Sequence, residues 1–208
     1  MRLWVFLVLV CATSVAFTSQ GVELGCKNLH VVLDTRLSTD VVEHVWGSGN
    51  SRSELPATLE LVGCDGLVLD RLNLDVPLAQ LDPVPVRGAA NPTYLVSVDL
   101  TTEAGSYNGP LTIPIEVVHG HLVAAVARYA DKSVEPIRLS LTGKLAWRKI
   151  SNRNADDLLY ISCQPKGPGF VTFYRRYFLS HQKWRVKVHA RDGLWESDGE
   201  FPHRNLFP

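Results

Sequence analysis

The sequence lacks the short motifs that mark the commonest enzyme classes. It contains no glycine-rich phosphate loop, no GxSxG segment, no HExxH segment and no CxxC pair. Such motifs hold phosphates, expose a nucleophile or ligate a metal in nucleotide-binding enzymes, α/β-hydrolases and zinc proteases. Their absence does not exclude catalysis by other means. We expect a non-enzymatic protein with no cofactor and no metal centre.

Long apolar runs and an excess of charge are also missing. The one sustained apolar run, residues 3–12, follows Arg2 and precedes small residues, with Ser14 and Ala16 at the minus-three and minus-one positions of a cleavage site. This pattern predicts a signal peptide over residues 1–16, and no later segment approaches the roughly 20 apolar residues of a transmembrane helix. The chain has 21 Lys plus Arg against 21 Asp plus Glu and no N-x-S/T acceptor. We expect a periplasmic or secreted bacterial protein.

Cysteine is scarce, and its positions suggest a single disulfide. Of the 4 cysteines, Cys11 lies in the predicted signal peptide. Export permits disulfides, and the most economical pair is Cys26 with Cys64, which would tie the first strand to an early hairpin. Cys163 follows the apolar run LLYIS, where we expect a buried, inert thiol because no nearby base would stabilise a thiolate.

Helical periodicity is nearly absent from the chain. One short helix is expected near residues 40–46, because Asp40 and Glu43 have capping-box spacing and Gly47 can end it. Elsewhere, short β-branched or alternating segments recur between turn residues, which predicts an all-β fold, an antiparallel β-sandwich or barrel-like sheet of about eleven strands. Residues 17–208 are expected to form a single β-rich domain, or two packed halves with a proline-rich connector near residues 81–92.

The clearest pattern is a β-hairpin over residues 170–191, FVTFYRRYFLSHQKWRVKVHAR. Two runs of strand-forming residues flank a four-residue loop, residues 180–183, which would place Leu179 opposite Trp184, Tyr177 opposite Val186 and Phe173 opposite Ala190. One face would then be apolar and face the core. Arg175 falls on this inner face, so it must reach the sheet edge, snorkel or find a carboxylate.

The other face of this hairpin is basic and aromatic. Since side chains alternate along a strand, a shift of one residue would bury its cations, and the register should be strongly enforced. We therefore expect it to be the partner-binding surface, made of Tyr174, Arg176, Phe178, Arg185, Lys187 and His189 and continued by Arg191.

An acidic segment follows the hairpin and offers an alternative role for this face. No carboxylate occurs in residues 158–191, yet Asp192, Glu196, Asp198 and Glu200 come directly afterwards. The acidic segment, residues 192–200, could fold back and neutralise the hairpin cations. In that case the basic face would be structural.

The basic face otherwise predicts a macromolecular partner. An acidic protein surface or an anionic envelope polymer would match its charge, as for an inhibitor or immunity-type protein, whereas nucleic acid is not expected for an exported chain of zero net charge. A structural envelope component without a discrete site is a further alternative.

The alternative from another class is a protein that acts on glycans. Trp195 could stack on a sugar ring with Glu196 and Asp198 as hydroxyl acceptors, in a carbohydrate-binding module or a secreted hydrolase. Two other polar clusters, the histidines of HGH at residues 119–121 and the Asn and Asp side chains of residues 152–157, are expected to be turn residues rather than metal ligands.

Overall fold

The structure, a computed structural model, describes residues 21–33, 56–99, 109–196 and 200–208. Over these residues the chain forms fifteen strands and one 3-10 turn, Arg204–Leu206. The predicted all-β fold is confirmed, and the strands beyond the expected eleven are short. The predicted signal peptide and the predicted helix at residues 40–46 both lie outside the described residues.

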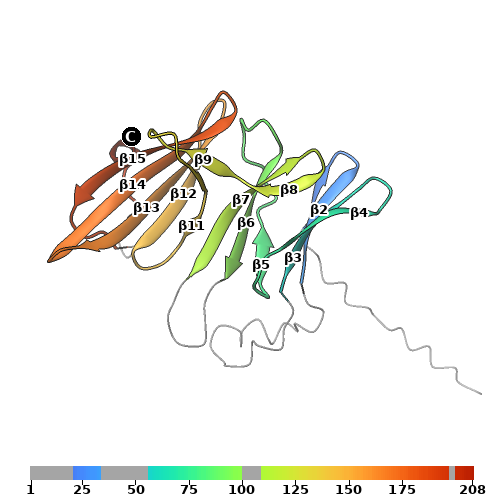
Figure 1. Ribbon diagram of the computed structural model, residues 1–208, viewed down its shortest axis with the longest axis horizontal. Helices are drawn as coiled ribbons and strands as arrows, with labels where there is room; N and C mark the ends of the chain where they lie inside the picture. The colour runs from blue at the N-terminus through green and yellow to red at the C-terminus, as the bar shows by residue number, and fades with distance from the viewer. Residues whose placement is uncertain (1–20, 34–55, 100–108, 197–199) are drawn as a thin grey trace, which may run out of the picture.

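Three sheets follow one another across the molecule (Figure 1). The first contains the N-terminal strands in the order β1-β2-β3-β4, all antiparallel. Their bounds are β1 Gly21–Leu24, β2 Lys27–Val32, β3 Thr58–Val62 and β4 Val68–Asn73.

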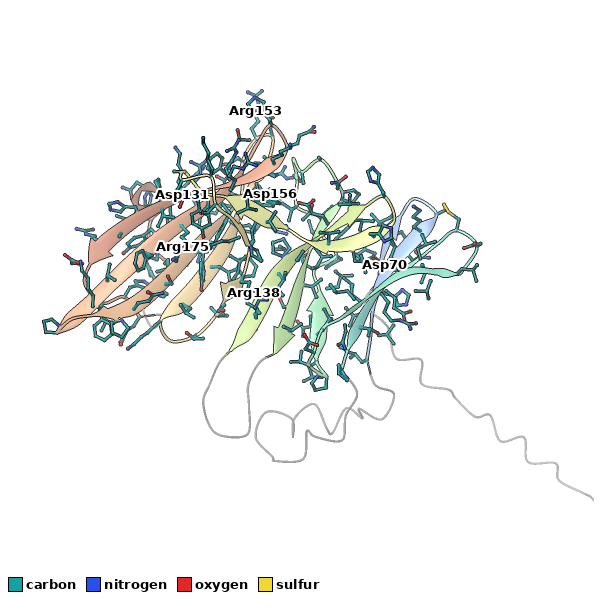
Figure 2. The ribbon with its side chains drawn as sticks, viewed as in Figure 1. Asp70, Asp131, Arg138, Arg153, Asp156 and Arg175 are labelled. Atoms are coloured by element: carbon teal, nitrogen blue, oxygen red, sulfur yellow. A yellow bond between two sulfur atoms is a disulfide. The ribbon has the colours of Figure 1, made fainter. Side chains whose placement is uncertain are left out.

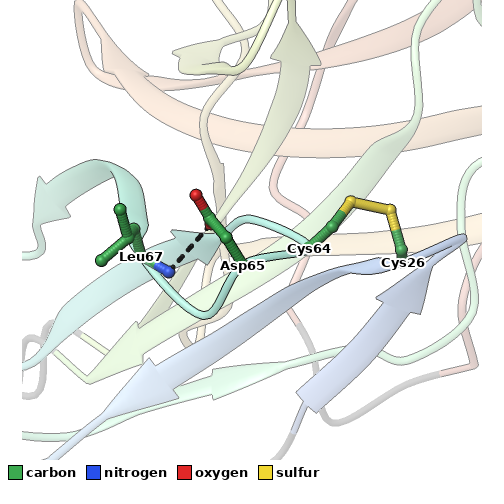
Figure 3. Close-up of a disulfide and its surroundings, with 4 residues drawn as sticks. All are labelled: Cys26, Cys64, Asp65 and Leu67. Carbon is green, nitrogen blue, oxygen red and sulfur yellow. Dashed lines mark hydrogen bonds between the residues drawn. A yellow bond between two sulfur atoms is a disulfide. The ribbon is translucent and has the colours of Figure 1, made fainter.

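The predicted disulfide between Cys26 and Cys64 is present in this first sheet (Figure 3). It joins the turn between β1 and β2 to the turn between β3 and β4, where Asp65 accepts a hydrogen bond from the backbone N–H of Leu67 at 3.1 Å. A disulfide of this kind suits an oxidising compartment.

The middle sheet has the order β11-β7-β6-β5, with β8 paired to β7. The turn between β7 and β8 is His119-Gly120, with both residues at positive φ, as expected for a two-residue hairpin turn. The bounds are β5 Ala79–Leu81, β6 Thr93–Asp99, β7 Pro110–Val118, β8 His121–Ala124 and β11 Leu139–Ser140.

The third sheet has the order β10-β9-β15-β14-β13-β12. Its pairings are antiparallel except for a single parallel bridge between β15 and β9. The bounds are β9 Val126–Arg128, β10 Val134–Pro136, β12 Leu145–Ser151, β13 Asp156–Lys166, β14 Gly169–Ser180 and β15 Lys183–Asp192.

The middle sheet contributes to two hydrophobic cores because its strands alternate. Tyr94, Val96 and Val98 of β6 join a core shared with the first sheet, whereas Leu95 between them joins a core shared with the third sheet. The stretch 81–92 connects neighbouring strands β5 and β6, and its Val86 belongs to the second core. Burial on both faces thus fixes the middle sheet between its neighbours.

Candidate binding surface on the C-terminal hairpin

The hairpin of β14 and β15 has the predicted register. Leu179 pairs with Trp184, Tyr177 with Val186 and Phe173 with Ala190. The predicted four-residue loop is wrong, because Ser180 pairs with Lys183 and only His181 and Gln182 form the turn, with φ of 50° and 62°. Two consecutive residues at positive φ are the geometry of a type I′ turn, whose twist matches that of the strands.

The inner face of the hairpin packs on the middle sheet as its pattern predicts. Tyr177, Trp184 and Val186 are buried in the second core with Leu158 of β13. Toward the far end of β15 this cover ends, and Val188 is 43% exposed. Apart from Arg175 the inner face is apolar, and it is exposed at Val188 and Ala190.

Arg175 lies on this inner face and is half-buried in the middle of the third sheet (Figure 2). Its guanidinium donates a hydrogen bond to the hydroxyl of Ser162 and lies 5.2 Å from the ring centroid of Phe173 and 5.8 Å from that of Tyr160. Aromatic faces stabilise such a cation by the ring quadrupole. Among the described residues, no carboxylate forms an ion pair with Arg175.

Three tyrosines near Arg175 have a pKa that burial raises. Burial raises the pKa of Tyr177 far above its ordinary value of 10 and also raises the pKa of Tyr129 and of Tyr160. The hydroxyls of Tyr129 and Tyr177 share a hydrogen bond. These phenols stay neutral at physiological pH, so they serve as hydrogen-bonding groups and not as bases.

The outer face of the hairpin is partly covered, contrary to the expectation for Tyr174. This side chain is only 7% exposed and meets the ring of Phe207 edge-on at 5.5 Å between centroids. Phe207 itself stacks on Phe201, and both pack with Leu159 and other apolar residues of the third sheet. The C-terminal segment therefore removes Tyr174 from the accessible surface.

Arg176 is also held by a neighbour that the sequence pattern did not reveal. Its guanidinium lies 2.9 Å from a carboxylate oxygen of Asp157, which is 3% exposed and also contacts Arg204 at 3.3 Å. The expectation that residues 152–157 form a turn is therefore wrong for Asp156 and Asp157, which begin β13. The signal available in the sequence was two carboxylates directly before an apolar run.

The remaining cations of the outer face form a band along β15, which we call the basic strip: Arg185, Lys187, His189 and Arg191. Lys187, His189 and Arg191 are exposed, and Arg185 is partly so. Lys187 and Arg176 both lie over the ring of Phe178, at 5.8 and 5.4 Å from its centroid. Arg185 also forms a backbone β-bridge with Arg128 of β9. The side chain of Arg128 therefore extends the cationic surface.

The acidic segment does not neutralise the basic strip within the described residues. Asp192 pairs with Lys166 at 2.8 Å. Glu196 and Glu200 are exposed, and within the described chain neither forms an ion pair with a cation of the strip. Apolar residues of the C-terminal segment, not its acids, cover the outer face. Trp195 is half-buried in this apolar cluster, and Asp198 lies outside the described residues.

Two other features are absent from the described part of the chain. There, no group of three His, Cys, Asp or Glu side chains has a metal-binding arrangement, and no helix is both long and apolar enough to cross a membrane. Cys163 is buried, as predicted. No family model, curated protein or solved structure matches the chain.

Proposed function

We propose that this is an exported, non-enzymatic protein, periplasmic or secreted, that binds an anionic macromolecule through the basic strip. The observation that carries the proposal is the set of cations on β15 that face solvent and form no ion pair with any described residue. An acidic protein surface or an anionic envelope polymer has the complementary charge, and an inhibitor or immunity-type role is one form of such binding.

The rigidity of the strip supports this role. Arg185, Lys187 and Arg191 are spaced along one strand that pairs with β14 over its whole length. Charges fixed on a sheet lose less conformational freedom on binding than charges on a loop, which favours affinity.

The glycan hypothesis receives less support from the geometry. A stacking platform needs an exposed ring, and Trp195 packs against the C-terminal apolar cluster. Of the residues that this hypothesis invoked, Glu196 remains exposed.

Charge reversal tests the proposal. Wild-type protein is expected to bind beads carrying polyglutamate at low ionic strength, and the double variant Lys187→Glu/Arg191→Glu is expected to bind at least about tenfold more weakly because two attractive charges become repulsive. Arg176 is left unchanged, since its loss would leave the buried Asp157 without this partner.

The matched control is Arg138→Glu/Arg153→Glu, which changes net charge equally at two exposed positions outside the strip (Figure 2). It should retain binding. Equal loss in both variants would show a net-charge effect, and undiminished binding by the strip variant would disprove the proposal.

A further inference from the structure

The outer edge of β15 is open over residues 187–192. β14 pairs with β15 along its whole length, but on the other side β9 meets it only at the bridge between Arg185 and Arg128. All six residues from 187 to 192 are exposed. Within the described chain, no strand lies against this edge.

The free backbone groups of this edge can be assigned. The N–H of Gly193 donates to the carbonyl of Phe170 at 2.9 Å, and hydrogen-bonded and non-bonded pairs alternate along an antiparallel ladder. Odd-numbered residues of β15 therefore bond to β14. The N–H and C=O groups of Val188, Ala190 and Asp192 point away from β14 toward the open side.

The two faces beside this edge differ sharply. Lys187, His189 and Arg191 project on the outer face, and Val188 and Ala190 project on the inner face next to Arg175 and Phe173. An added strand would place alternate side chains beside each set. The matching sequence alternates acidic and apolar residues.

A second copy of this chain is a poor occupant for the edge. Antiparallel pairing of two β15 strands would set cations directly opposite cations, which is destabilising. Cations on an edge strand are indeed a common protection against self-pairing. The same cations would attract an acidic strand at this edge.

We infer that the open edge of β15 binds an extended acidic segment of a partner protein by strand addition. The inference rests on the proposed function and specifies its partner and mode. Backbone hydrogen bonds to Val188, Ala190 and Asp192 supply affinity, and acidic side chains over the basic strip, alternating with apolar side chains beside Val188, supply specificity. An anionic polysaccharide could use the cations but lacks the peptide groups of a strand.

The binding mode is tested with a labelled, acetylated peptide, Glu-Val-Glu-Val-Glu-Val-Glu, followed by fluorescence anisotropy with wild-type protein. Binding is expected, and it should fall at least about tenfold for two control peptides. One has the same composition with its four Glu residues placed together, and the other is N-methylated at alternate residues on the edge that faces β15. No binding of the parent peptide, or equal binding of all three, would overturn the inference.

The matching protein variant is Ala190→Pro, which removes an outward-pointing N–H and keeps every cation. Proline is tolerated on an edge strand when its missing N–H faced solvent, so β14 pairing should persist. Ala190→Thr is the control, since it retains the N–H and favours a strand. We expect Ala190→Pro to lose at least about tenfold in peptide affinity and Ala190→Thr to keep it.

The outcomes separate the two proposals. If Lys187→Glu/Arg191→Glu loses polyglutamate binding while Ala190→Pro binds the peptide as wild type does, strand addition is wrong and the basic strip remains the binding surface. If the charge variant keeps all binding, the proposed function fails as well. The N-methylated peptide gives the same answer with unaltered protein if Ala190→Pro does not fold.

Discussion

Two adjacent carboxylates show how single residues attach separate segments to the third sheet. Asp156 and Asp157 are 1% and 3% exposed, and as neighbours on β13 they point to opposite faces. Asp156 accepts hydrogen bonds from the backbone N–H and the guanidinium of Arg87. Asp157 contacts Arg204 of the C-terminal segment. Each carboxylate therefore anchors a stretch of chain that crosses the sheet.

The substitution Asp156→Asn is expected to destabilise the protein by about 2 to 3 kcal/mol at neutral pH, because charge-assisted hydrogen bonds are lost from a buried site. Burial raises the pKa of Asp156, but the bonds from Arg87 outweigh it and bring the pKa below its ordinary value of 3.8. A lowered folded pKa stabilises the protein above pH 3.8, and this contribution is lost as the pH falls through the folded value.

Urea denaturation between pH 2 and 7 measures this effect, and the gap between wild type and variant should shrink toward the acid end. The control is Asp192→Asn, whose pair with Lys166 is exposed and should contribute less than about 0.5 kcal/mol. A gap that stays constant with pH would contradict the assigned ionisation.

At the scale of elements, the turn of the C-terminal hairpin carries conformational strain. His181 and Gln182 both have positive φ, although type I′ turns favour Asn followed by Gly, and a side chain costs roughly 1 kcal/mol in the left-handed region. Because residues 181–182 are His-Gln and not Asn-Gly, no local signal predicted a two-residue turn. The pairing of the flanking strands imposes it.

Replacing Gln182 with Gly should stabilise the protein by about 0.5 to 1 kcal/mol, because glycine adopts positive φ without a steric penalty. Thermal unfolding gives the comparison. The opposite change serves as control: Gly167→Ala, in the turn between β13 and β14 where φ is 56°, should lower the melting temperature. A lower melting temperature for Gln182→Gly would show that contacts of the glutamine side chain stabilise the protein by more than its positive φ costs.

At the scale of the whole molecule, the disulfide and the proposed binding surface lie in different sheets. The disulfide lies in the first sheet, whose buried residues share a core with the middle sheet. The basic strip lies on β15 of the third sheet, which the middle sheet separates from the first sheet (Figure 1). A change in the first sheet should therefore alter the stability of the protein without altering binding at the basic strip.

Removing the disulfide, by Cys26→Ser/Cys64→Ser, should cost about 4 kcal/mol for a separation of 38 residues in the chain-entropy account. The melting temperature should fall, while polyglutamate binding measured well below it should be unchanged. The variant Cys163→Ser, at the buried free thiol, controls for loss of a cysteine. Loss of binding in the folded double variant would show that the sheets are coupled.

The fold was more predictable than the surface. The pattern of residues 170–191 predicted the hairpin register and its core face correctly, since one face is apolar except at Arg175. It predicted exposure of Tyr174 wrongly, because Phe207 packs against that ring. It also could not reveal that Arg176 pairs with Asp157. In both contacts the two residues are far apart in the sequence, so a local pattern cannot predict that they meet.

By itself the sequence determined the all-β class and the two faces of the hairpin, because alternation along a strand is a local property. It also favoured the pairing of Cys26 with Cys64 as the most economical one. Only the tertiary structure decided which outer-face residues remain exposed and that the edge at residues 187–192 is open. These features depend on where the C-terminal segment and β9 pack. A strand's own residues specify its faces, but its neighbours decide which groups a partner can reach.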